Sequence, residues 1–315
     1  VGAAELLRFL PMSVLVGFTA GAGILIGVMQ LDEALGIPPI RSGSLFGELQ
    51  GLYDALSSGS SPQLPAVAMT LGTAAMLILG KKYAPRWPIA LITMLASIAI
   101  VAIGSLNEST GLPLVGDRSP IPSGWPPGAL PTLELSVIHS LLAPSLALVL
   151  LGTLELTVTA QAGAERPNMK RELFAQGVAN LFGAFASAFP ASASLTRSVL
   201  LKLGGGRTRV AALIAALTVV PILLFGGTFV GLVPQSALAG VLLVTAYGMI
   251  NVPRIYRMFR AWRVTQVLLM VTLGATLTMP LQYAILLGAG LGLAIHLGRT
   301  RSPRFNILAV EGGAF

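Results

Sequence analysis

Cysteine is absent from this chain, and histidine occurs only as His139 and His296. Without cysteine the chain forms no disulfide, no thiolate metal site and no cysteine nucleophile. Two histidines are too few for a histidine-rich metal centre, and serine, histidine and aspartate form no recognisable hydrolytic set. We therefore expect no enzyme, no metal site and no cofactor, apart from a coupling proton or sodium ion.

Charged residues are also scarce. They make up 10% of the chain, whereas a soluble domain carries about 25%. Hydrophobic residues make up 54%, and the mean hydropathy is +0.82. This composition is typical of an all-α polytopic membrane protein embedded in a lipid bilayer. The chain begins at Val1 without a signal segment, and we expect it to be part of a longer protein.

Apolar runs mark the candidate membrane spans, because about 20 apolar residues cross the hydrocarbon as a helix. We predict spans at 9–30, 64–80, 88–106, 137–161, 173–189, 192–203, 209–226, 234–250, 264–279 and 281–298. These are about ten helices or half-helices, since 192–203 covers only about half a bilayer. The segments 57–62 and 116–131 are rich in Gly, Pro and Ser and are predicted loops.

Basic residues fall almost entirely on one side of these spans. If the chain starts inside, 17 of the 20 Lys and Arg lie in inner segments, Arg41 and Arg118 lie outside, and Arg197 lies within the membrane zone. The positive-inside rule predicts this pattern for an inner (plasma) membrane protein with a cytoplasmic C-terminus. The net charge of +8 is therefore a topology signal, and we expect no nucleic acid partner.

Two predicted helix starts share one sequence pattern. Residues 11–17 read PMSVLVG and residues 234–240 read PQSALAG, so both fit P-x-S-x-L-x-G. The predicted topology places these starts on opposite sides of the membrane, as an inverted repeat does. The alternative is coincidence, because Pro, Ser, Leu and Gly are common in membrane helices.

An inverted repeat also divides the chain into segments. We predict that 1–112 is the remainder of a first repeat, 113–136 an extracytoplasmic linker, 137–298 a second repeat, and 299–315 the start of a cytoplasmic region. The first three spans then correspond to the last three.

A polar break separates the apolar runs 173–189 and 192–203. Pro190 followed by small hydroxyl residues ends one helix and caps the next, which places the amino end of a half-helix near the membrane midplane. Free N–H groups and the helix dipole at such an end favour an anion. The predicted anion-binding residues are Ser192, Ala193, Ser194, Leu195, Thr196 and Arg197. The alternative is a plain helix break whose Arg197 reaches the inner surface or pairs internally.

A second candidate site lies on the span 137–161. Glu155 and Thr159 are four residues apart and share one helix face. A carboxylate with a hydroxyl one turn away can hold a proton or ligate sodium, so we predict a cation-coupling role. The alternatives are an ion pair between Glu155 and Arg197 or a purely structural polar contact.

Several of these stretches resemble the SulP family of sulfate and related anion permeases. Residues 17–21, GFTAG, are similar to a stretch of the fifth SulP helix, and residues 171–181, RELFAQGVANL, are similar to the family pattern REL-x-AQG-x-ANL. Residues 190–198 and 205–208 continue the resemblance in the expected order. Together these stretches extend the resemblance over about residues 5–300.

The resemblance implies a fold of seven-plus-seven inverted repeats, divided into core and gate domains, with the first four family helices missing here. It implies that 192–203 is the half-helix of the second repeat and that Glu155 occupies the acidic position of the eighth helix. It also implies that Thr159 assists sodium binding, as in bicarbonate members. Members are usually homodimers and usually end in a STAS domain, of which residues 304–315 would be the first strand.

The residues and the resemblance together predict a secondary active transporter of a small inorganic anion, sulfate or bicarbonate, that is coupled to protons or sodium and works by an elevator-like shift. Three alternatives stay open: a nucleobase permease of the same architecture, an uncoupled anion channel or exchanger, and a nonfunctional remnant.

Overall fold

The computed structural model describes residues 11–40, 42, 44–85, 87–118, 124–125, 127–161, 168–194, 197–198, 201–202, 204–206 and 208–300. Within these ranges every regular element is a helix, and the only β interaction is an isolated bridge between Leu114 and Pro234. The predicted all-α class is therefore confirmed for the part of the chain that is described.

Helices follow most of the predicted apolar spans. They are α2 (Met12–Val28), α5 (Leu64–Tyr83), α6 (Ile89–Gly104), α9 (Leu135–Gln161), α10 (Met169–Phe185), α12 (Arg209–Leu217), α13 (Val219–Phe225), α15 (Gln235–Met249), α17 (Arg263–Thr278) and α18 (Leu281–Thr300). The remaining helices are α3 (Leu31–Leu35), α4 (Leu45–Ser57), α7 (Leu106–Thr110), α8 (Val115–Arg118), α14 (Gly227–Gly231) and α16 (Val252–Phe259). Among the described residues, four stretches are long and apolar enough to cross a bilayer as single helices, namely 12–35, 64–83, 135–157 and 235–259.

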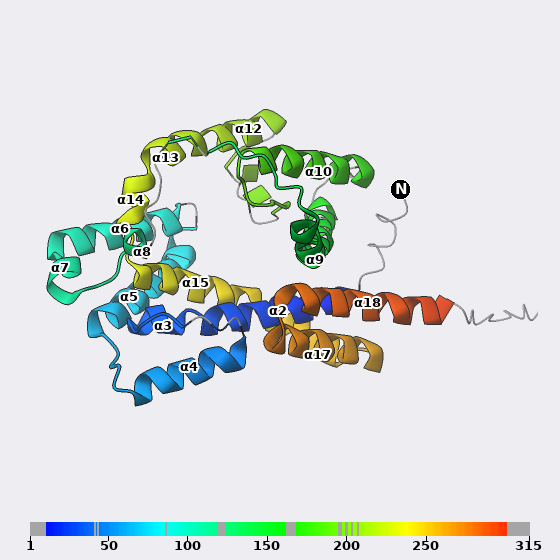
Figure 1. The fold of residues 1–315 in the computed structure, drawn as a ribbon, viewed down its shortest axis with the longest axis horizontal. Coiled ribbons are helices and arrows are strands. Elements are labelled where there is room, and N and C mark those ends of the chain that lie inside the picture. The colour runs from blue at the N-terminus through cyan, green and yellow to red at the C-terminus, as the bar shows by residue number, and fades with distance from the viewer. Residues whose placement is uncertain are drawn as a thin grey trace, which may run out of the picture.

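The helices form two groups (Figure 1). In the larger group α2 packs against α15, α17 and α18, while α5 packs against α15 and α6. The helices α9, α10, α12 and α13 lie to one side of this group. Contact between the groups runs mainly through α9 and α18, where Phe18, Ala147 and Ile285 form a small apolar cluster.

The larger group has the internal symmetry that the repeated sequence pattern predicts. Both α2 and α15 follow a proline N-cap in the same extended conformation, Pro11 with φ −64° and ψ 138° and Pro234 with φ −65° and ψ 135°. The two helices contact each other and begin at opposite ends of the group (Figure 1). If α2 corresponds to α15 and α17 corresponds to α5, the contact between α2 and α17 should have an equivalent between α15 and α5. Both of these helix pairs are in contact. This is the arrangement of an inverted repeat, so the shared pattern is not coincidental.

The glycine of each repeated pattern lies at one of these paired contacts. A Cβ atom on Gly17 would lie 2.7 Å from the Leu269 carbonyl oxygen of α17 and 3.2 Å from Thr272 Cβ. A Cβ atom on Gly240 would lie 2.6 Å from the Thr70 carbonyl oxygen of α5 and would also collide with the hydroxyl of Thr73. Glycine is therefore required on both helices because the neighbouring backbone comes so close.

The threonines that face these glycines are equivalent as well. Thr73 Oγ1 donates to the Met69 carbonyl on α5 at 2.9 Å, and Thr272 Oγ1 donates to the Leu268 carbonyl on α17 at 2.7 Å. Each hydroxyl is thus satisfied within its own helix, as a buried hydroxyl in an apolar setting must be. Gly240 then faces the hydroxyl of Thr73, whereas Gly17 faces the Cβ atom of Thr272.

Two predicted spans differ from the helices observed. The span 173–189 is a helix over Met169–Phe185 instead, because Asn168 caps its start by accepting hydrogen bonds from the N–H groups of Lys170 and Arg171 at 3.1 and 3.4 Å. The span 209–226 is divided at Thr218 into α12 and α13. Residues 9 and 10 of the first span lie outside the described residues, and the domain limits at 112, 136 and 298 stay predictions.

Candidate functional site

The polar break predicted near Pro190 is present in the structure. Helix α10 ends at Phe185, residues 188–194 are not helical, and helix resumes in the described residues 197–198 and 201–202. Ser187 has a φ of 54°, in the left-handed region that a residue with a side chain rarely adopts, and its hydroxyl donates to the Pro127 carbonyl at 2.7 Å. The chain therefore leaves α10 through a sharp turn and continues extended.

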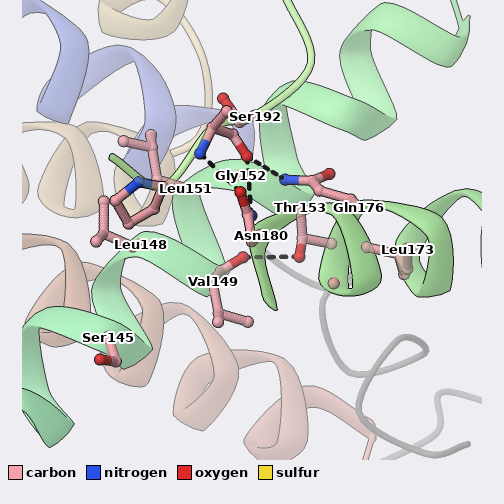
Figure 2. Close-up of a pocket in the computed structure, with 13 residues that line it drawn as sticks. Ser145, Leu148, Val149, Leu151, Gly152, Thr153, Leu173, Gln176, Asn180 and Ser192 are labelled. Atoms are coloured by element: carbon pink, nitrogen blue, oxygen red, sulfur yellow. Dashed lines mark hydrogen bonds between the residues drawn. The ribbon is translucent and has the colours of Figure 1, made fainter. Parts of the chain in front are cut away.

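Two amide side chains of α10 hold the extended stretch in place. Asn180 Nδ2 donates to the Ala191 carbonyl at 3.0 Å, and Asn180 Oδ1 accepts from the Ala191 N–H at 2.9 Å. Gln176 Nε2 also donates to the Ala191 carbonyl, at 3.4 Å (Figure 2). The sequence reasoning did not single out these two residues. The signal that was available is the spacing of four between two amides on one face of an apolar helix.

A side-chain hydrogen bond joins the extended stretch to α9. The Ser192 hydroxyl donates a hydrogen bond to Glu155 Oε2, which joins the two candidate sites that the sequence named separately. Thr159 Oγ1, one turn along α9 from Glu155, is buried and has no hydrogen-bond partner among the described residues. Glu155 itself is exposed.

Ser194 starts the helix that follows. Its hydroxyl accepts from the Arg197 N–H at 3.4 Å, and its carbonyl accepts from the Ser198 N–H at 3.0 Å. This is the geometry of a serine N-cap, as the hydroxyl-rich sequence predicts. Ala193 lies between Ser192 and this cap and is partly buried, whereas the predicted site residues Leu195 and Thr196 lie outside the described residues.

Arg197 does not pair with Glu155. Its side chain is exposed, and the only ion pair within the described ranges joins Arg118 and Glu33 at 2.5 Å. The structure therefore disfavours an internal Glu155–Arg197 pair. The guanidinium group of Arg197 stands near the start of the helix as a positive charge without a carboxylate partner in the described part of the chain.

A cavity of about 330 Å³ lies between α9, α10 and the extended stretch (Figure 2). Its lining comprises Ser145, Leu148, Val149, Leu151, Gly152, Thr153, Leu173, Gln176, Gly177, Asn180, Pro190, Ala191 and Ser192. The oxygen Oε1 of Gln176 is buried and has no partner among the described residues. The described residues contain no cluster of three or more His, Cys, Asp or Glu that would hold a metal ion. The cavity is thus mainly apolar, with a few converging amide and hydroxyl groups, as is typical of small-molecule sites.

Comparison with protein families assigns the chain to a family. The model of the sulfate permease family matches residues 3–274. The chain belongs to the sulfate permease family. The resemblance to SulP permeases described from the motifs is therefore confirmed, and the chain is an integral membrane protein rather than an enzyme.

Curated relatives agree with this assignment over nearly the whole chain. A probable sulfate transporter of Mycobacterium tuberculosis is 28% identical over 312 residues, which is 98% of this chain and 54% of the relative. Probable sulfate transporter 4.2 of Arabidopsis thaliana is 28% identical over 316 residues, which is 96% of this chain and 45% of the relative. The chain thus spans about half the length of the curated relatives it matches.

Solved structures show the same fold. The murine Solute Carrier 26 family member A9 anion transporter, in its inward-facing state, superposes with a TM-score of 0.77 at 20% identity and covers 92% of this chain and 48% of its own. The transmembrane domain of the cyanobacterium bicarbonate transporter BicA superposes with a TM-score of 0.71 at 19% identity, covering 92% of this chain and 70% of its own. These likenesses confirm the predicted inverted-repeat transporter fold.

Proposed function

We propose that this sulfate permease family chain is the membrane part of a secondary active transporter for a small inorganic anion, sulfate or bicarbonate. The observation that carries the proposal is the broken helix at Pro190, whose Ser194-capped continuation begins beside a cavity and beside Glu155. A relative named as a probable sulfate transporter and a structural neighbour named as a bicarbonate transporter support the anion class.

The anion is held, in this proposal, at the amino end of the helix that follows the break. A helix amino end carries free N–H groups and about half a positive charge, both of which favour an anion. The backbone of Ala193, Leu195 and Thr196 and the hydroxyls of Ser194 and Thr196 supply the donors, while the single O–H of Ser192 is engaged with Glu155. Arg197 adds a full positive charge near this end and so strengthens the attraction.

Glu155 and Thr159 supply the coupling ion site in this proposal. Glu155 already accepts a hydrogen bond from Ser192, so an ion or proton on its carboxylate changes the geometry of the anion site directly. Thr159 Oγ1 is buried without a partner among the described residues, which leaves an oxygen ligand free for sodium. The anion and cation sites thus share Ser192, and this shared residue is the physical basis for symport.

The movement proposed is a shift of the smaller helix group against the larger one. Their contact is narrow, since it runs mainly along α9 and α18, and it includes the apolar cluster of Phe18, Ala147 and Ile285. Apolar side chains without hydrogen bonds slide past one another at little cost, as in shear motions of packed helices. The larger group is tied together by the paired glycine contacts and would serve as the fixed gate.

A nucleobase permease is the second candidate, because one observation favours it. A base needs amide or carboxylate partners for its edge, and Gln176 Oε1 is an acceptor in the cavity lining with no partner among the described residues. Asn180 in contrast has both of its amide atoms engaged with Ala191. A single free amide oxygen is less than a base edge requires, so the inorganic anion is the better match.

Uptake into proteoliposomes tests the proposal. The full-length protein containing this chain is reconstituted, and uptake of radiolabelled sulfate, bicarbonate and uracil is measured with and without sodium and proton gradients. We expect concentrative uptake of sulfate or bicarbonate driven by one of these gradients. Uptake that only equilibrates the anion would indicate a channel or exchanger, uracil uptake would overturn the anion assignment, and no uptake would indicate a remnant.

A homodimer in an inner membrane, with the C-terminus cytoplasmic, completes the proposal. The inside assignment rests on the basic residues, of which 17 of 20 fall on one side of the spans. Mass measurement of the detergent-solubilised protein distinguishes a dimer from a monomer, and protease access to the C-terminus in sealed vesicles gives its side.

A further inference from the structure

We propose that Asn180 is a positioning residue for the anion site, because its side-chain amide clamps the peptide groups of Ala191 and thereby places Ser192 against Glu155. The inference rests on the proposed anion function, and it assigns to α10 a role beyond packing. Asn180 acts on the anion site through Ala191 in this account, since its Oδ1 and Nδ2 atoms are both bonded to the Ala191 backbone.

The extended stretch needs an external partner of this kind. Backbone N–H and C=O groups at membrane depth must be satisfied within the protein, and residues 188–194 have no helix or sheet to do this. Asn180 offers one donor and one acceptor on a single planar amide, as the edge of a neighbouring strand would. It satisfies the Ala191 N–H at 2.9 Å and the Ala191 carbonyl at 3.0 Å together.

By holding Ala191, the Asn180 clamp also fixes the position of Ser192. Ser192 follows Ala191 directly, and its hydroxyl bonds to Glu155 on α9. The chain of contacts therefore runs from α10 through Asn180 and Ala191 to Ser192 and α9. If Ala191 moves by about an ångström, the Ser192 hydroxyl loses the geometry of that hydrogen bond, because such bonds weaken steeply with distance and angle.

Gln176 plays a secondary part in the clamp. It lies one turn before Asn180 and donates to the same Ala191 carbonyl, but at 3.4 Å, and it makes no bond to the Ala191 N–H. A carbonyl has two lone pairs, so both amides can donate to it at once. Asn180 makes two hydrogen bonds to Ala191, both shorter than the single one from Gln176. We therefore expect replacement of Asn180 to change anion half-saturation more than replacement of Gln176.

Variants at position 180 test the clamp in the full-length protein. Asn180→Ala removes both hydrogen bonds, and Asn180→Asp keeps the acceptor for the Ala191 N–H but sets a carboxylate oxygen against the Ala191 carbonyl. Leu181→Ala, at the neighbouring exposed position of the same helix, is the matched control. Sulfate and bicarbonate are the probes, and half-saturation and maximal rate of uptake are measured together with the thermal unfolding midpoint.

We expect both Asn180 variants to raise the half-saturation concentration by about tenfold, which corresponds to about 1.4 kcal/mol. Leu181→Ala should leave it unchanged. Wild-type half-saturation in a folded Asn180→Ala or Asn180→Asp protein would overturn the proposal. Absence of uptake by the wild type would instead refute the proposed function, so the two failures are distinguishable.

A double-mutant cycle separates positioning from general stability. If Asn180 acts through Ser192, then Asn180→Ala has little further effect on half-saturation once Ser192 is already alanine. Purely structural damage would add fully to the effect of Ser192→Ala, and additivity would therefore overturn the proposal. Should Asn180→Ala fail to fold, the same cycle is run with Asn180→Asp, which keeps the side-chain volume.

Discussion

The close packing of Gly240 at the α15–α5 contact predicts how much stability is lost when this glycine is replaced by alanine. In Gly240→Ala the new Cβ would lie 2.6 Å from the Thr70 carbonyl oxygen and closer still to the Thr73 hydroxyl. Distances below 3.0 Å force one helix to move, and overpacking of this kind costs about 1–3 kcal/mol. Alanine also gains about 0.5–1 kcal/mol over glycine within a helix. We therefore expect a net loss of stability of up to about 2.5 kcal/mol, and near 1 kcal/mol at the middle of these ranges.

Gly72→Ala is the matched control for this variant. Gly72 lies within α5, next to the same contact, and a Cβ there meets nothing within 4 Å. The helix-propensity gain is common to both variants, so the difference between them isolates the packing cost of about 1–3 kcal/mol. Unfolding of the detergent-solubilised protein, followed by tryptophan fluorescence, measures both.

A second substitution identifies the colliding atom. Adding Thr73→Ala to Gly240→Ala removes the hydroxyl but leaves the Thr70 carbonyl in place, so stability should recover only in part. If Gly240→Ala unfolds at the same midpoint as Gly72→Ala, the close approach of α15 and α5 is absent and the inverted-repeat packing described above is wrong.

Three further changes have distinct expected results. Glu155→Gln should abolish the dependence of uptake on the sodium or proton gradient. The half-saturation concentration for the anion should stay within about threefold of the wild-type value, which corresponds to less than 1 kcal/mol. Unchanged gradient dependence would reject the coupling role. Asp32→Ala should destabilise the protein by about 1.5–3 kcal/mol, because the buried carboxylate accepts from the N–H groups of Glu33 at 2.7 Å and Ile40 at 2.9 Å. Arg118→Ala should cost less than about 1 kcal/mol, since its ion pair is partly exposed. If Asp32→Ala and Arg118→Ala lowered the free energy of unfolding equally, the conclusion that Asp32 is buried and Arg118 partly exposed would be contradicted.

The membrane spans could be predicted because their apolar runs are long. The start of α10 was missed for a physical reason, because Asn168 caps a helix that begins at Met169, four residues before the predicted start at 173. Its end was missed because the apolar run continues past Phe185, whereas the backbone turns at Ser187. Hydrophobicity does not distinguish an apolar helix from an apolar extended stretch. The helix α16 was missed because its start is set by a cap, Asn251, whose side chain accepts from the Arg254 N–H at 3.1 Å.

Individual residues of the candidate site were predicted from the sequence, but the contacts between them were not. Ser192, Ser194 and Glu155 were named from their residue types and from the helix break, but the bond between Ser192 and Glu155 joins residues 37 apart in the chain and follows only from the fold. The amide clamp was missed because the spacing of Asn180 and Gln176 on one face of α10 does not reveal what they bind. Their partner is backbone, which has no sequence signature.

Protection of a single cysteine at the break tests the central claim most directly. This chain contains no cysteine, so Ala193→Cys introduces one reporter into it between Ser192 and Ser194. The rate of its reaction with a small thiol reagent is measured with increasing amounts of the transported anion and with gluconate as control. The account predicts that the transported anion slows the reaction, with half-protection at its half-saturation concentration for uptake. An unchanged reaction rate in a protein that still transports would place the anion elsewhere.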